Sequence, residues 1–343
     1  MKLVSGLCLA VLVSLSCAAF AQSPATPEQA QQQRQMTQPG NNAPVWREVR
    51  KEGESHYTSI QGRETGVLVQ SWGDTWRRIR NGPVTFWGGW VVVGVLLAIA
   101  ALYFTAGPVK LHDRPTGRTI RRFSPIEQVA HWCTAISFVV LGLSGLIMLF
   151  GKHVLLPIFG YTLFAWLTAL AKNLHNFVGP FFIVSTPIFV VLFIRYNLPR
   201  AYDFAWFAKA FSYVTGKAHV PSGKFNGGEK VWFWFGVVVL SVVVSWSGLI
   251  LLFPNFDQTR AVMQEAWIWH AVAALIYIAM SLGHIYLGTL GVEGAYQAMR
   301  TGYVDEVWAK EHHEIWYNEV KAGGAVAASG AVPAGAPHMR EKS

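Results

Sequence analysis

Two histidines, His270 and His284, stand in a run from Trp267 to Leu290 that contains no Asp, Glu, Lys or Arg. The run is long enough for a helix that crosses a bilayer. A spacing of fourteen residues is close to four helical turns, so both rings fall on about the same face, roughly 21 Å apart along the axis. An imidazole inside a membrane is costly without a partner, and its ring nitrogens bind metals such as haem iron. The spacing therefore predicts two cofactor sites, one near each edge of the hydrocarbon layer.

The composition is that of an integral membrane protein. Of 343 residues, 52% are hydrophobic and 14% are charged, whereas soluble domains average about 25% charged residues. The net charge of +9 comes mainly from residues between the apolar runs, so it indicates topology and contact with membrane lipids rather than nucleic-acid binding. We expect an all-α fold, a membrane helical bundle of five transmembrane helices, over 86–105, 126–150, 174–194, 231–253 and 265–290.

Before the first of these helices, the N-terminal part changes character several times. Lys2, an apolar core and the triplet Ala19-Phe20-Ala21 are typical of a cleaved signal peptide, with an uncleaved anchor as the alternative. A Gln- and Pro-rich stretch follows, and then one in which aromatic and polar residues mix but which is too short for a large core. The predicted segments are a signal peptide (1–21), a disordered linker (22–44), a periplasmic segment (45–83), an extra transmembrane helix (84–106), a four-helix domain (107–291) and a cytoplasmic tail (292–343).

Basic residues in the loops predict the orientation. The connections 106–125 and 195–230 and the tail after residue 291 carry five, six and five Lys or Arg, whereas 151–173 and 254–264 carry two and one. Positive residues stay on the cytoplasmic side. We therefore expect a multi-pass protein of the bacterial inner membrane, with the mature N-terminus in the periplasm and the C-terminus in the cytoplasm.

Four of the eleven histidines lie in the predicted transmembrane helices, and their depths sort them into two pairs. His175 and His270 fall near the outer side, and His131 and His284 near the inner side. Each pair comes from two different helices and could supply the two axial nitrogens of a b-type haem. The sequence has no Cys-x-x-Cys-His motif for covalent haem, and two histidines without a carboxylate or thiolate make a poor zinc site. The alternative is that each histidine is an ordinary interfacial residue.

Small residues accompany the histidines in these helices, namely Gly142, Gly145, Gly179, Gly248 and Gly283. They could admit a flat macrocycle, although membrane helices also use small residues simply to pack together.

We expect the remaining seven histidines, His312 and His313 among them, to lie at the surface. Cys133 would be the one cysteine left after signal cleavage, which excludes an internal disulfide and a cysteine-ligated iron–sulfur cluster.

A polar loop, SGKFNGGEK, precedes the fourth predicted helix on the inner side. Asn226, the backbone N–H of Gly228 and the acid Glu229 could bind a quinone headgroup and supply protons. The alternative is a plain turn with a helix cap, which Asn-Gly-Gly also forms well.

The chain resembles the gamma subunit of membrane-bound respiratory formate dehydrogenases, a dihaem cytochrome b. The resemblance covers about residues 120–320. The tail Trp308-Ala-Lys-Glu-His312-His313-Glu-Ile-Trp316-Tyr317 is also similar. The other motifs that carry it are Glu127-Gln-Val-Ala-His131-Trp132, Lys172-Asn-Leu-His175-Asn, Lys224-Phe-Asn226-Gly-Gly228-Glu-Lys230, Trp269-His270-Ala and His284-Ile-Tyr286.

This resemblance implies two haems b in a four-helix core, with the first transmembrane helix as an addition. The outer haem iron would take His175 and His270, and the inner haem iron would take His131 and His284. The quinone, menaquinone or ubiquinone, would lie at Asn226, Gly228 and His284, with Glu229 where the family often has a glutamine-like residue.

The resemblance also implies partners and a direction for electrons. A periplasmic iron–sulfur beta subunit and a molybdenum- or tungsten-containing alpha subunit would oxidise formate and deliver electrons to the outer haem. The chain would anchor this complex and reduce quinone near the cytoplasmic face, and nothing in its own sequence suggests a formate-oxidising site. The alternatives are the cytochrome b subunit of a hydrogenase or thiosulfate-reductase-type complex, and a haem-free membrane anchor or transporter.

Overall fold

The computed structural model describes residues 72–215, 220–254, 256 and 258–323, together with Thr26, Gln29 and Gln32. The chain divides into two units, Met1–Thr65 and Gly66–Ser343, and all the elements named below belong to the second. The predicted signal peptide, nearly all of the predicted linker, most of the predicted periplasmic segment and the end of the tail lie outside the described residues.

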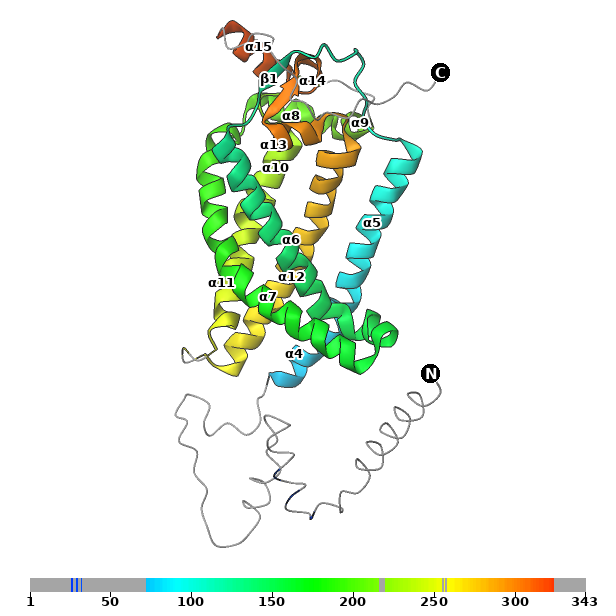
Figure 1. Ribbon diagram of the computed structural model, residues 1–343, viewed down its shortest axis with the longest axis vertical. Coiled ribbons are helices and arrows are strands. Elements are labelled where there is room, and N and C mark those ends of the chain that lie inside the picture. The colour runs from blue at the N-terminus through cyan, green and yellow to red at the C-terminus, as the bar shows by residue number, and fades with distance from the viewer. Residues whose placement is uncertain are drawn as a thin grey trace, which may run out of the picture. The chain divides into compact units, whose positions relative to one another are not determined.

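Five helices of the described part are long and apolar enough to cross a membrane. They run side by side in one bundle (Figure 1), which confirms the predicted all-α membrane fold. Large apolar side chains such as Phe177 and Trp246 are exposed on the outside, at 82% and 69%, as a lipid-facing surface requires. The five spans are Gly73–Thr105, Pro125–Val154, Leu156–Tyr196, Gly227–Leu252 and Arg260–Gly291.

The first span is built from α4 (Gly73–Ile79), a π-helical segment η1 (Arg80–Trp87) and α5 (Gly88–Thr105). It therefore begins before residue 84, where the sequence places the start of the extra helix. Pro83 lies inside the π-helical segment, where it has no N–H to donate. The span packs along α12 (Arg260–Tyr286). At Gly88, an added Cβ would lie only 2.4 Å from a methyl carbon of Leu275, so glycine permits this close approach.

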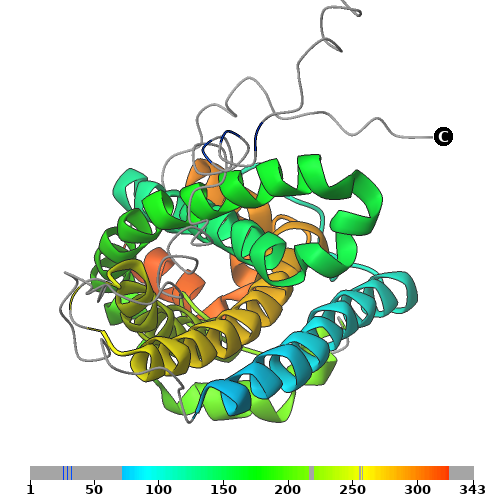
Figure 2. The ribbon, with the colours of Figure 1, turned by 90° about the horizontal axis from the view of Figure 1, so that it is seen from below.

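Four further elements make the core of the bundle: α6 (Pro125–Val154), α7 (Leu156–Phe193), a composite third helix and α12. Ser124 caps α6, because its hydroxyl accepts from the backbone N–H of Glu127 and the Glu127 carboxylate accepts from the N–H of Ser124. In Figure 2, α6, α7, α11 and α12 surround the bundle axis, and α5 lies outside them against α12. The composite helix consists of α10 (Gly227–Val231), η3 (Trp232–Leu240) and α11 (Ser241–Leu252), and η4 (Leu287–Gly291) continues α12.

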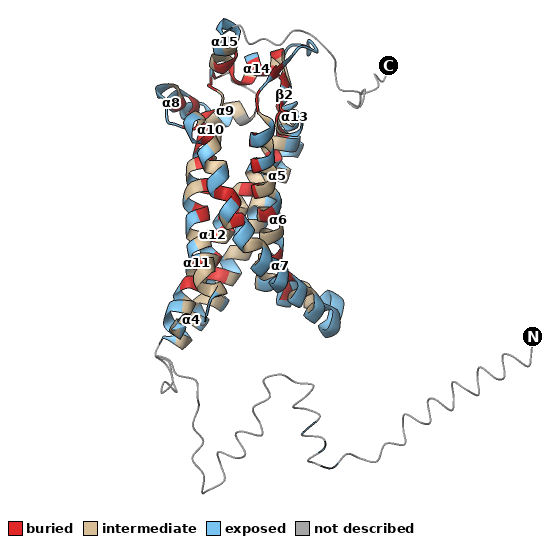
Figure 3. Cartoon of the chain, turned by 60° about the vertical axis from the view of Figure 1, so that its left-hand side comes forward, coloured by how far each residue is buried: buried red, intermediate tan, exposed pale blue. Residues whose placement is uncertain are grey.

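One end of the bundle, where α6 begins and α12 ends, is covered by folded segments. We call it the tail end, and the opposite end the far end. Strand β1 (Thr119–Arg121) pairs antiparallel with β2 (Tyr303–Asp305), with Ile120 opposite Val304. Figure 3 shows that buried residues gather at this end. The other elements there are η2 (Ile194–Tyr196), α8 (Ala201–Ala208), α9 (Ala210–Val214), α13 (Ala295–Thr301), α14 (Glu306–His312) and α15 (Glu314–Ala322).

Two of the histidines expected at the surface are buried in this cover. His312 and His313 are 4% and 2% exposed, so that prediction was wrong. His313 donates its Nδ1 hydrogen to the carbonyl of Gly223 over 2.8 Å, and Trp308 packs against both rings. Burial lowers the pKa of His313 well below its ordinary value, with the charge of Arg122 acting in the same direction. The tail therefore folds onto the bundle instead of extending as a polar segment.

Candidate functional site

Near the far end, His175 of α7 faces His270 of α12. Their ring centres lie 5.9 Å apart. The Nδ1 of His175 hydrogen-bonds to the hydroxyl of Ser144 over 2.9 Å, and His270 donates its Nδ1 hydrogen to the carbonyl of Val244 over 3.0 Å. When Nδ1 is used in this way, the ring is oriented and Nε2 keeps its lone pair for a metal.

Both rings line a cavity of about 430 Å³ inside the bundle, a volume typical of ligand pockets. Four of the five glycines singled out in the sequence also line it, whereas Gly283 is not among its lining residues. A Cβ added at Gly248 would lie 3.2 Å from the Cε1 of His270, and one at Gly145 would lie 3.6 Å from that of His175. Larger residues would therefore crowd the histidines and fill the cavity.

The second pair of histidines meets toward the tail end. His131 of α6 faces His284 of α12, with ring centres 6.3 Å apart. Aromatic side chains surround them: Trp232 stacks on His284 at 5.1 Å and 15°, and Phe189 lies 6.2 Å from His131. The Nδ1 of His131 is buried without a hydrogen-bond partner in the described structure. An unsatisfied buried polar atom is costly, and His131 lacks the Nδ1 contact that orients the two far-end rings.

Both pairs fit a haem iron. Two imidazoles that bind one metal ion through bonds of about 2 Å have ring centres about 6 Å apart, close to the 5.9 and 6.3 Å found here. Among the described residues, no group of three or more His, Cys, Asp or Glu could hold a metal ion. The donors suit a planar macrocycle that supplies the other four ligands, and do not suit a metal cage made by the protein alone.

The residues predicted to bind quinone form the start of α10. Asn226 caps this helix: its Oδ1 accepts from the N–H of Glu229 over 3.0 Å, and its own N–H donates to the Glu229 carboxylate over 2.8 Å. The structure thus contains the turn and cap that the sequence offered as the alternative. Gly228 packs closely under Trp206, 2.5 Å from an added Cβ. The helix continues directly into Trp232, which stacks on His284.

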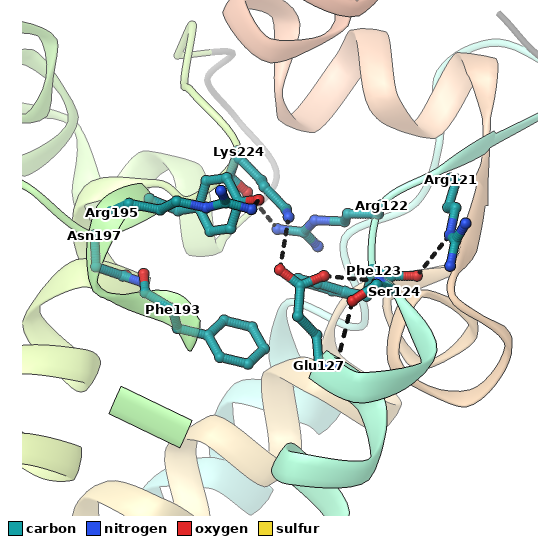
Figure 4. A network of polar contacts seen from close by, with 10 residues as sticks. Arg121, Arg122, Phe123, Ser124, Glu127, Phe193, Arg195, Asn197 and Lys224 are labelled. Carbon is teal, nitrogen blue, oxygen red and sulfur yellow. Dashed lines mark hydrogen bonds and ion pairs between the residues drawn. The ribbon is translucent and has the colours of Figure 1, made fainter. Parts of the chain in front are cut away.

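A buried charged network next to this loop was not predicted. Arg122 donates to the carbonyl of Lys224 over 2.7 Å and to the Glu229 carboxylate over 3.2 Å. Lys224 lies 3.5 Å from the Glu127 carboxylate, and Figure 4 shows Lys224, Arg122 and Arg195 converging above Glu127. In the sequence, these basic residues are interpreted as indicators of membrane orientation. The Ser-Pro-x-Glu pattern at 124–127, which is typical of a helix cap, is the one local signal that could have indicated part of the arrangement.

The network lines a second cavity, of about 450 Å³. Burial lowers the pKa of Lys224 to about 8, with Arg122 and Arg195 acting in the same direction and Glu127 opposing them. Burial likewise lowers the pKa of Arg122, opposed by Glu229. The tail end therefore holds a space of about 450 Å³ bounded by charged groups, one of which, Lys224, belongs to the predicted quinone loop.

Comparisons with known proteins identify the family of this chain. Residues 122–302 match the family described as prokaryotic cytochrome b561. The chain is 34% identical over 209 residues to the formate dehydrogenase cytochrome b556(fdo) subunit of Escherichia coli K12, which covers 59% of this chain and 94% of that subunit. It is 29% identical over 214 residues to the nitrate-inducible formate dehydrogenase cytochrome b556(Fdn) subunit of the same strain, with 60% and 93% covered. The formate dehydrogenase cytochrome b556 subunit of Haemophilus influenzae is 27% identical over 213 residues, with 59% and 83% covered.

Proposed function

The chain belongs to the prokaryotic cytochrome b561 family and is a formate dehydrogenase cytochrome b subunit, and on this premise we propose that it passes electrons through two b haems to a quinone. The observation that carries the proposal is the double use of α12. His270 and His284, on this one helix, each face a histidine of another helix at a ring separation that suits one iron.

In this proposal, His175 and His270 hold the haem iron near the far end, and His131 and His284 hold the one near the tail end. Haem supplies reversible one-electron chemistry when it is bound. The protein orients the rings, through Ser144 and the carbonyl of Val244 at the far end, and surrounds both sites with apolar side chains that exclude water. Electrons would enter at the far-end pair and leave at the tail-end pair.

The direction follows from the loop charges. The basic connections and the basic tail lie at the tail end, so this end would face the cytoplasm and the far end the periplasm. A periplasmic far end suits donation by an iron–sulfur beta subunit, itself supplied by a molybdenum- or tungsten-containing alpha subunit. The predicted signal peptide and the N-terminal segment of 45–83 fit the same orientation.

Quinone, menaquinone or ubiquinone, would be reduced at the tail end, beside Asn226, Gly228, Glu229 and His284. Reduction to the quinol consumes two electrons and two protons. The first N–H groups of a helix have no partner within the helix. In α10 the Asn226 cap takes the N–H of Glu229, so the N–H groups of Gly227 and Gly228 would serve a quinone carbonyl oxygen. The cavity bounded by Glu127 and Lys224 would let protons arrive from the cytoplasmic side.

The test is electron transfer in the purified complex. With formate as the donor, the b-haem absorbance should become reduced, and added quinone should reoxidise it. His284→Ala should leave formate-driven reduction of the far-end haem intact and abolish quinone reduction. A chain that purifies with a hydrogenase, or one whose haems formate does not reduce, would overturn the proposal.

A further inference from the structure

The first transmembrane span contributes an arginine to the far-end cavity. Arg80, the first residue of η1, is among the residues that line this cavity together with His175 and His270. Its guanidinium carbon lies 5.4 Å from the ring centre of Trp76 and 5.2 Å from that of Trp267. The two tryptophans also pack edge to face at 5.9 Å. Two cation–π contacts therefore hold the charge of Arg80 at one fixed place.

A second cation lines the same cavity. Lys172 precedes His175 by three residues on α7, so the two side chains lie on one face of that helix, and both are lining residues. Trp267 has the same relation to His270 on α12. The two cations thus enter the cavity one turn away from the two facing histidines.

The rest of the cavity does not balance these charges. Its walls are mostly apolar, and no Asp or Glu is among its lining residues. Neither Arg80 nor Lys172 has a carboxylate within ion-pair distance in the described part of the chain. A charge at membrane depth is costly and is normally paired, so two cations beside one apolar cavity call for an anionic ligand.

We propose that Arg80 and Lys172 bind the two propionate carboxylates of the haem that His175 and His270 hold. This inference rests on the proposed function. Haem b is a flat apolar macrocycle with two carboxylates, which matches an apolar cavity that carries two cations. The planar fork of an arginine is well suited to a carboxylate, and the tryptophan contacts hold it in advance of binding.

The inference gives the additional span a role. Arg80 lies outside residues 122–302, which match the family, so this haem contact comes from a part of the chain that the family core lacks. The close packing of Gly88 on Leu275 keeps the span against α12, and the π-helical segment begins at Arg80 itself.

The experiment is a redox titration of the purified complex, followed by the absorbance of its b haems. In the wild type, two components are expected. Arg80→Gln should lower the midpoint potential of one component only, because a cation near the propionates favours the more negative, reduced haem. We expect about a tenfold lower ratio of reduced to oxidised haem at a fixed potential, about 59 mV for one electron, or loss of that haem. Lys172→Gln, at an exposed position, should shift the same component by less.

Two further variants serve as controls. Arg78→Gln removes a charge from the same helix, but the Arg78 side chain is 77% exposed and pairs with Asp74 at 2.8 Å, so both potentials should stay at wild-type values. Arg80→Lys keeps the positive charge, so it should retain the haem and have a midpoint potential close to that of the wild type. If Arg80→Gln does not fold, Lys172→Gln decides the question.

Two negative results are distinguishable. If the wild type has two haems and both potentials are unchanged in Arg80→Gln and in Lys172→Gln, the propionate contacts are refuted and the proposed function stands. If the wild type does not titrate as two b haems, the proposed function itself fails.

Discussion

The Nδ1 hydrogen of His270 is donated to the main-chain carbonyl of Val244, over 3.0 Å. This contact joins α12 to α11 and defines which nitrogen of the ring carries the proton. It leaves the Nε2 of His270 with its lone pair for a metal, and the Nδ1 of the facing His175 contacts Ser144. In an otherwise apolar bundle, these few polar contacts fix the geometry of the far-end pair.

The close approach of Gly248 to His270 gives a first prediction. An alanine at this position would place its Cβ 3.2 Å from the Cε1 of His270, so the ring must move by a few tenths of an ångström. We expect Gly248→Ala to weaken retention of the far-end haem about tenfold, if the displacement costs about 1.4 kcal/mol. Haem content after dialysis measures this. Gly94→Ala, at an exposed position of α5 with no atom within 4 Å of its new Cβ, is the matched control, and equal haem loss in both variants would refute the argument.

Much of the bundle was predictable because local patterns determine it. The five spans follow from the length of the apolar runs, and the depth-matched histidines followed from helical spacing and loop charge. The structure brings together the same pairs, His131 with His284 and His175 with His270. Their role as haem ligands stays a prediction until it is tested.

Other features depend on contacts between distant segments and have no local signal. His313 is buried because the tail returns to meet Gly223, ninety residues earlier. Arg80 looks like a flanking charge in the sequence, and only packing against α12 brings it to Trp267. The charged network around Arg122 is likewise assembled from the start of α6, the loop before α10 and the tail.

Lys224 predicts a pH dependence of stability. Burial lowers its pKa to about 8, from 10.5 in the unfolded chain. Below pH 8 the lysine is charged in both states and the cost of its burial is fully present. Between about pH 8 and 10.5 the unfolded chain binds more protons, so the stability of the folded state rises with pH.

The matching measurement is the free energy of unfolding of the wild type minus that of Lys224→Met. This difference should move in favour of the wild type by roughly 2–3 kcal/mol between pH 7 and pH 10. A difference that is constant across this range, or that moves toward the variant, would contradict the assignment.

A buried ion pair holds α8 against α10. Lys230 donates to both oxygens of Asp203, over 2.9 and 2.8 Å, and the two side chains are 5% and 8% exposed. Asp203→Ala would leave a buried charge without its partner, and we expect a loss of about 3–5 kcal/mol in stability. Combining Asp203→Asn with Lys230→Met should cost less than either charge removed alone. Thermal unfolding in detergent tests this, and a loss under about 1 kcal/mol in Asp203→Ala would speak against it.

Gly302 ends α13 with a positive φ of 83°. Here an added Cβ would lie 2.7 Å from the carbonyl oxygen of Phe123, so Gly302→Ala combines backbone strain with a clash against main chain. Gly117 also has a positive φ, 74°, but has no atom within 4 Å of an added Cβ. We expect Gly117→Ala to cost about 1–2 kcal/mol, the strain alone, and Gly302→Ala to cost clearly more. Equal losses, measured by thermal unfolding, would show that the contact with Phe123 is not restrictive.

The most direct test of the central claim is the number of haems per chain in His270→Ala, measured by extraction and by the reduced-minus-oxidised spectrum. His153→Ala, a change at an exposed position at the end of α6, is the control. The wild type and the control should each hold two b haems. His270→Ala should hold only the tail-end haem, and formate should no longer reduce it. If His270→Ala keeps two haems per chain, the pairing of His175 with His270 around one iron is wrong.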